Sequence, residues 1–86
     1  MITTVETIST AAAALFVSTV SIFDDLTDAQ VSAAIDHALR THGGDAGCTA
    51  DVAQAYGDHP ELAAPRMRWA RRLAEHLYRP CLAAAA

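Results

Sequence analysis

Apolar residues at helical spacing constrain the fold of this chain more than any other feature. The clearest case begins at Thr27, which forms a capping box with Gln30 and has Leu26 and Val31 placed as a hydrophobic staple. One apolar face follows at three- and four-residue steps: Val31, Ala34, Ile35, Ala38 and Leu39. Gly43 and Gly44 are typical of a helix end. The pattern predicts a helix from Thr27 to about His42.

The N-terminal segment has the same spacing. Its apolar seam consists of Met1, Val5, Ile8, Ala12, Leu15, Thr19, Ile22 and Leu26, widened by Phe16 and Phe23. This pattern predicts a helix along the segment. The alternative is a strand across residues 15–23, because Val, Ile, Phe and Thr favour strands. We prefer the helix, since the preceding alanines are poor strand formers.

The second half of the chain predicts a loop over residues 43–48 and a short helix over residues 49–56, closed by Gly57. Asp58 and Glu61 resemble a capping box around Pro60, so one further turn is expected there. Because proline is tolerated in the first helical turn, Pro65 is placed at the start of a last helix that runs to about Arg79. Pro80 is expected to end it.

Together these elements predict an all-α fold, a small bundle of three long helices plus one short helix. We expect one domain over residues 1–80 and a disordered, alanine-rich tail over residues 81–86. A chain of 86 residues buries only about 60–65% of its unfolded surface. Its net stability is then a few kcal/mol, so a partner or a second copy would matter for stability.

Charge is strongly segregated along the chain. Residues 1–65 hold nine carboxylates against the single Arg40, whereas residues 66–86 hold five arginines against Glu75. The formal net charge of −4 therefore conceals a dipole of about −8 and +4. Such segregation indicates association, and it directs attention to the last helix.

On a helical wheel the last helix divides into two faces. Its predicted core residues are Met67, Ala70, Leu73, Ala74 and Leu77. Its predicted binding face consists of Arg68, Arg71, Arg72 and Arg79, with Trp69 and Tyr78 at its two shoulders. Arginine binds carboxylates and phosphates through a planar fork, and a neighbouring aromatic ring adds contact area. The alternative is a solvated face on which Glu75 pairs with Arg71 and Arg79.

Three kinds of partner are compatible with this face. A protein partner is favoured, and self-association is its variant, because Asp24, Asp25 and Asp28 form an acidic complement. DNA binding is the second hypothesis, since Ala53 and Gly57 have the offset of a helix-turn-helix motif. Overall acidity and the interruptions expected at Pro60 and Pro65 oppose it. A structural module that self-assembles through the first helix is the third hypothesis.

Catalytic and metal signals are weak. His37, His42, Cys48 and His59 are of metal-ligand type, but their spacing matches no paired zinc pattern. A thiolate pair of Cys48 with a histidine lacks a third, orienting group. We therefore expect no metal, no cofactor, no small-molecule substrate and no enzymatic activity.

The cellular setting is expected to be the bacterial cytoplasm. Cys48 and Cys81 form no paired motif and are expected to be reduced thiols. Residues 7–23 carry no charge, but they are rich in Ser and Thr and are preceded by Glu6 rather than basic residues. A membrane span and a signal peptide are therefore not expected. The resulting hypothesis is a small, non-enzymatic regulatory protein that docks a protein partner.

Overall fold

The computed structural model describes the backbone of residues 4–85 and the side chains of residues 5–79. In this part of the chain it contains four helices and no strand. They are α1 (Thr4–Val17), α2 (Asp28–His42), α3 (Gly44–Asp58) and α4 (Pro60–Ala85). The all-α class is confirmed. The predicted division into three long helices and one short helix is wrong, because the shortest of the four has 14 residues.

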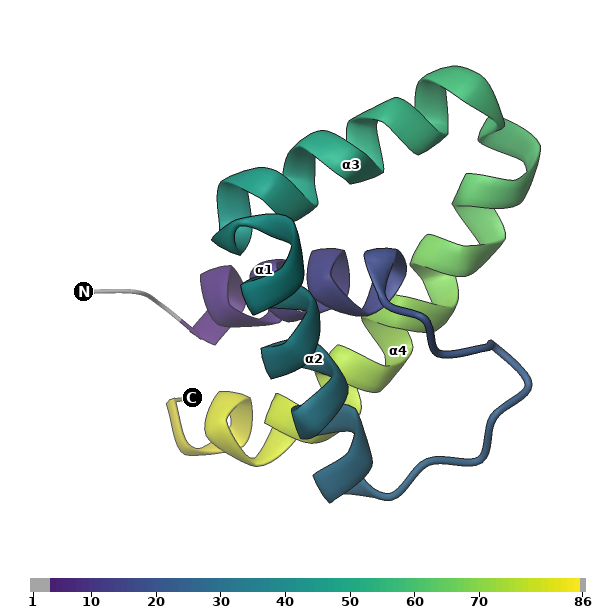
Figure 1. Cartoon of the computed structure of the whole chain (residues 1–86). Coiled ribbons are helices and arrows are strands. Elements are labelled where there is room, and N and C mark those ends of the chain that lie inside the picture. The colour runs from purple at the N-terminus through teal and green to yellow at the C-terminus, as the bar shows by residue number, and fades with distance from the viewer. Residues whose placement is uncertain (1–3, 86) are drawn as a thin grey trace.

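Helix α1 forms the centre of the bundle. It contacts α2, α3 and α4, and Figure 1 shows it enclosed by the other three helices. Residues 11–16 are all buried, so α1 is apolar around its whole circumference over this stretch. The run of four alanines lets the neighbouring helices approach closely. The apolar seam that predicted self-assembly through this helix therefore packs, over residues 11–16, against the other helices of the same molecule.

Helix α1 ends earlier than its apolar seam predicted. It stops at Val17, and residues 18–27 form an irregular connection that contains a turn at residues 22–23. The predicted helix over the first part of the segment is confirmed, whereas its extension to Leu26 is wrong. The alternative of a strand across residues 15–23 is wrong as well. Beyond Val17 the β-branched residues disfavour a helix, and no neighbouring strand exists for them to pair with in the described chain.

Helix α2 confirms its predicted start and end. The Thr27 side chain accepts a hydrogen bond from the Gln30 backbone (3.1 Å), and the Gln30 side chain accepts one from the Thr27 backbone (2.9 Å). Both bonds of the predicted capping box are thus formed. Gly43 ends the helix with φ of 83°, a left-handed conformation that glycine adopts without steric cost.

Helix α3 corrects the prediction of a loop followed by a short helix. It begins at Gly44 and runs for 15 residues, so the predicted loop over residues 43–48 is wrong. A single residue, Gly43, separates α2 from α3. Gly57 lies inside α3 instead of closing it, and the turn to α4 falls at His59.

Helix α4 begins one proline earlier than predicted. Pro60 occupies its first position, where the missing N–H costs nothing, and Pro65 lies one turn inside. In Figure 1 the helix changes direction along its course, as expected for an internal proline. The backbone continues through Pro80 to Ala85, so the predicted end at Pro80 is wrong. The side chains of residues 80–86 lie outside the described part, and the disordered tail stays a prediction.

None of the helices in the described residues is both long and apolar enough to cross a membrane.

Candidate protein-docking surface

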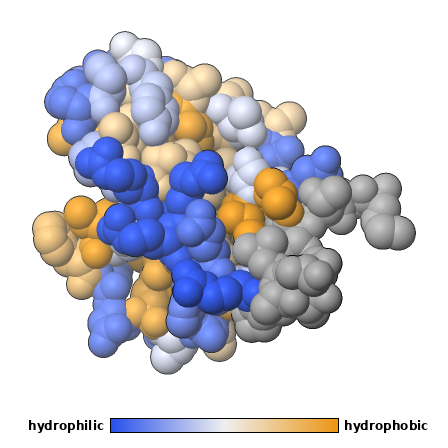
Figure 2. Space-filling view, turned by 180° about the vertical axis from the view of Figure 1, so that it is seen from behind, coloured by the Kyte–Doolittle hydropathy of each residue, from blue (hydrophilic) through white to orange (hydrophobic). Residues whose placement is uncertain are grey.

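Helix α4 has the two faces that the helical wheel predicted. Its inner face is formed by Ala70 and Ala74, which are fully buried, and by Met67, Leu73 and Leu77, which pack against the core. Its outer face exposes the four predicted arginines, Arg68, Arg71, Arg72 and Arg79. Figure 2 shows a band of strongly hydrophilic side chains on this side of the molecule, flanked by apolar patches.

These four arginines have no acidic partner among residues 5–79. The three ion pairs in this region join His42 to Asp51, His59 to Glu61, and His76 to Asp28. The predicted pairing of Glu75 with Arg71 and Arg79 is not formed at ion-pair distance. The acidic half of the described chain therefore leaves the positive charge of α4 open to an external ligand.

Trp69 does not lie at the edge of this surface as predicted. Its side chain is only 8% exposed and belongs to the core, so the prediction of a free aromatic anchor is wrong for this residue. Tyr78 is half-buried and packs against the core. The wheel placed both residues at shoulders of α4, but Trp69 packs in the core and the guanidinium group of Arg66 lies over its ring.

Arg66 explains how that shoulder is covered, and sequence reasoning missed its role. Its Nε donates to the carbonyl of Phe16 (2.6 Å). Its Nη2 donates to the carbonyls of Leu15 (3.3 Å), Ser18 (2.9 Å) and Val20 (2.9 Å). Helix α1 has no basic residue in its last turn, so α4 supplies the cation that its C-terminal carbonyls attract. Arg66 is thus a structural residue, and burial lowers the pKa of its guanidinium group.

A groove lies between the start of α1 and the C-terminal half of α4. Its volume is about 460 Å³, within the usual range of ligand pockets. Helix α1 contributes Val5, Ile8 and Ser9, and α4 contributes Arg71, Glu75 and Arg79. Val5 is 68% exposed. One wall is therefore apolar and the other carries two arginines, a combination suited to a ligand with both an apolar and an acidic part.

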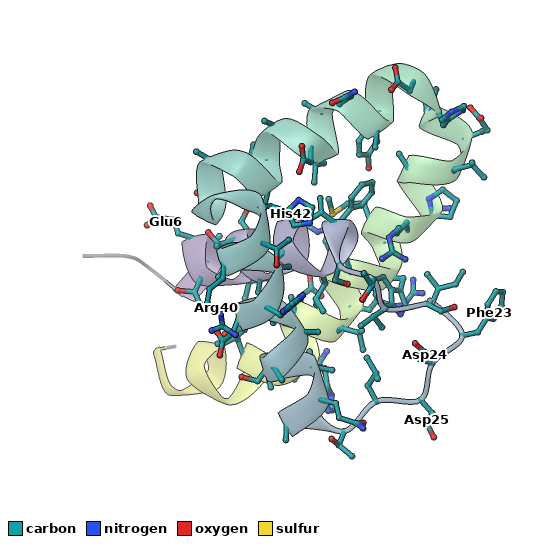
Figure 3. The ribbon with its side chains drawn as sticks, viewed as in Figure 1. Glu6, Phe23, Asp24, Asp25, Arg40 and His42 are labelled. Carbon is teal, nitrogen blue, oxygen red and sulfur yellow. The ribbon has the colours of Figure 1, made fainter. Side chains whose placement is uncertain are left out.

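The predicted acidic cluster lies on and next to the connection between α1 and α2. Figure 3 shows Asp24 and Asp25 on this segment, with Phe23 projecting away from the protein. Asp24 accepts a hydrogen bond from the Ser21 backbone (3.0 Å), and Asp28 lies 3.6 Å from His76. Asp25 has no hydrogen-bond or ion-pair partner among the described residues. Phe23 is 89% exposed, the largest value among the large apolar side chains of residues 5–79, and the helical seam had assigned it to an interior stripe.

The histidines and cysteines do not form a metal site in the described residues. No three side chains of His, Cys, Asp or Glu come together there. His42 Nδ1 lies 2.7 Å from Asp51 Oδ2, so the orienting group that the sequence seemed to lack for His42 is present. Cys48 is fully buried, however, and its Sγ contacts the Ala38 carbonyl at 3.8 Å. Burial, followed by the charges of Asp51 and Asp45, raises the pKa of the Cys48 thiol, which disfavours the thiolate that a nucleophile requires.

The described residues thus present a cationic surface on α4 with a mixed apolar and cationic groove beside it, and, on another side of the molecule, an acidic turn with an exposed aromatic ring. A comparison with known proteins finds no matching family model, no similar curated protein and no similar solved structure.

Proposed function

We propose that this protein is a small non-enzymatic docking module that binds an acidic surface of another protein through Arg68, Arg71, Arg72 and Arg79. The observation that carries the proposal is that these four guanidinium groups are exposed and have no carboxylate partner among the described residues. Unpaired charges of one sign raise the encounter rate with a surface of the opposite sign.

The geometry also supplies the apolar component that a specific interface needs. Charge alone gives steering and selectivity, whereas affinity comes from buried anchors and the pockets they fill. Trp69 is not available as an anchor, and Tyr78 is only partly so. Val5 and Ile8 line the same groove as Arg71 and Arg79. These two residues provide the apolar contact area that the sequence analysis had assigned to Trp69. We therefore place the apolar anchor on the partner and its pocket on this protein.

DNA binding through the same arginines remains the second candidate. One objection from the sequence no longer applies, because α4 is a continuous helix across Pro65. The helix-turn-helix offset is not supported, since Gly57 lies within α3 and has no positive φ. Glu75 and the net charge of −4 oppose phosphate contacts. A protein partner fits the mixed groove better than a uniformly anionic backbone does.

The proposal is tested by capture from an extract of the native host, followed by mass spectrometry of the bound proteins. The wild-type protein is compared with the double variant Arg71→Glu/Arg72→Glu. We expect the variant to lose the captured protein, because two attractive charges become repulsive. Its helical circular dichroism should be unchanged, since both side chains point to solvent.

The matched control is Arg40→Glu, which reverses an exposed arginine on α2. This variant should retain the partner. Equal capture by the wild-type protein and the α4 variant would overturn the proposal. Nucleic acid in the bound fraction would support the DNA alternative instead. In that case the logarithm of the binding constant should fall linearly with the logarithm of the salt concentration, with a slope of about −0.9 for each phosphate contact.

A further inference from the structure

We propose that one occupant of the groove is the acidic turn of a second copy, so that the protein assembles head to tail. In this arrangement the Phe23 ring of one copy enters the groove between α1 and α4 of the next. Asp24 and Asp25 then face Arg71 and Arg79 of that copy. The inference rests on the proposed function, because it assigns a ligand to the same cationic surface.

The turn has the features of a preorganised ligand. The Ser21 Oγ accepts a hydrogen bond from the Phe23 backbone N–H (3.1 Å), and the Ser21 carbonyl accepts one from the Asp24 backbone N–H (3.1 Å). The Asp24 carboxylate closes the turn by accepting from the Ser21 backbone. These local bonds hold Phe23 outward, so less conformational entropy is lost when the ring becomes buried.

The turn also exposes two adjacent apolar side chains. Phe23 is 89% exposed and its neighbour Ile22 is 43% exposed, although each would gain free energy by leaving water. Two adjacent apolar side chains on an ordered turn offer apolar surface that an interface can bury. Their two acidic neighbours restrict the partner surface to one that is apolar and cationic.

The groove meets both requirements. Val5 and Ile8 offer apolar contact to the ring, and Arg71 and Arg79 offer guanidinium groups to the carboxylates. Glu75 also lines the groove and reduces its net charge from +2 to +1. Arg68 and Arg72, exposed on the same helix, add two further positive charges. Two aspartates therefore meet a surface that is positive overall.

The two surfaces cannot meet within one molecule. Figure 3 places Phe23 on the opposite side of the protein from Glu6, which lies between groove residues Val5 and Ile8 on α1. The longest dimension of the molecule is 38 Å, and the turn is anchored to the other end by Arg66. A contact between unlike surfaces of identical copies is heterologous, so it produces a ring or an open chain rather than a closed two-fold dimer.

Molar mass as a function of concentration tests the inference. Sedimentation equilibrium of the wild-type protein up to about 1 mM should show growth beyond the 9.1 kDa monomer, with species larger than a dimer. Phe23→Ser should reduce the association constant at least about tenfold, because the ring supplies the buried contact. The groove variant Arg71→Glu/Arg79→Glu should do the same. High salt should weaken the wild-type assembly.

Mixing the two variants gives the decisive result. The Phe23→Ser protein keeps an intact groove, and the groove variant keeps an intact turn, so the mixture has one working interface and should stop at a 1:1 heterodimer. The control is Arg40→Glu, which should assemble like the wild type. A mixture that stays monomeric, or a wild-type protein that is monomeric at every concentration, would overturn the inference.

These outcomes separate the inference from the proposed function. A monomeric wild type whose captured partner is lost on Arg71→Glu/Arg72→Glu substitution would remove self-assembly and leave the docking function standing. If self-assembly is found while capture of another protein is insensitive to the arginines, the docking of an external partner fails instead.

Discussion

The guanidinium carbon of Arg66 lies 4.8 Å from the ring centroid of the buried Trp69, one turn further along α4. The same guanidinium group donates to four backbone carbonyls at the end of α1 and in the connection that follows it. One residue therefore joins α4 to the end of α1 and to the start of the segment that carries Phe23. Stacking on Trp69 holds the fork in place for these bonds.

Replacing Arg66 should destabilise the protein more than replacing any other arginine. Arg66→Ala leaves the carbonyls of Phe16, Ser18 and Val20 without their donor, and we expect a loss of about 2–4 kcal/mol in the free energy of unfolding. Arg66→Lys should recover only part of it, because an ammonium group lacks the planar fork. Urea denaturation measures both. Arg40→Ala, at an exposed site, should change stability by less than about 0.5 kcal/mol.

Gly47 should be intolerant of any side chain. A Cβ atom built on it would overlap the carbonyl oxygen of His42, because the single-residue turn at Gly43 brings the end of α2 against the first turn of α3. Gly47→Ala should therefore lower the free energy of unfolding by at least about 2 kcal/mol. Gly57→Ala is the matched control, since its Cβ would meet nothing within 4 Å. That substitution should stabilise α3 by up to about 1 kcal/mol, and thermal unfolding of the two proteins should shift in opposite directions.

Stability should decline at alkaline pH because of Cys48. Burial raises the pKa of its thiol above the ordinary value of 9.0, so the folded state retains a proton that the unfolded state releases. The contribution is fully present below pH 9.0 and is lost as pH rises through the higher folded pKa. Urea denaturation between about pH 8 and 10.5 measures the effect. The free energy of unfolding should fall more steeply with pH for Cys81→Ala, which keeps Cys48, than for Cys48→Ala/Cys81→Ala. Parallel curves would contradict a buried, protonated Cys48.

The capping box of α2 should contribute measurably to stability. Thr27→Ala removes the acceptor for the Gln30 backbone N–H, and we expect a loss of about 1 kcal/mol in the free energy of unfolding. Thr49→Ala, at an exposed position inside α3, should be neutral or slightly stabilising because alanine is the better helix former. A comparison of the two threonine variants separates the cap from the general effect of the substitution.

Features encoded by local sequence were predicted well. The capping box at Thr27, the glycine at position 43 and the two faces of α4 each depend on residues a few positions apart, and the structure confirms them. The predicted loop over residues 43–48 failed because a one-residue turn at Gly43 is enough to separate two helices. The second left-handed glycine, Gly44, already starts α3 (φ of 77°).

Features that depend on contacts distant in sequence could not be predicted. Arg66 and Phe16 are 50 positions apart, so nothing in the arginine-rich window distinguishes Arg66 from its exposed neighbours. The guanidinium group of Arg66 also lies over the ring of Trp69, which the wheel alone placed at an edge. The groove likewise combines residues from both ends of the chain. The charge segregation indicated a cationic surface, but only the packing of α1 against α4 shows the pocket beside it.

The affinity of the captured partner for the wild-type protein and for Arg71→Glu/Arg72→Glu, measured by titration calorimetry at physiological salt, tests the account most directly. We predict that the double reversal weakens binding at least about 100-fold, while Arg40→Glu changes it by less than about threefold. Equal affinity of the wild-type protein and the double variant would contradict the assignment of the α4 arginines as the docking surface.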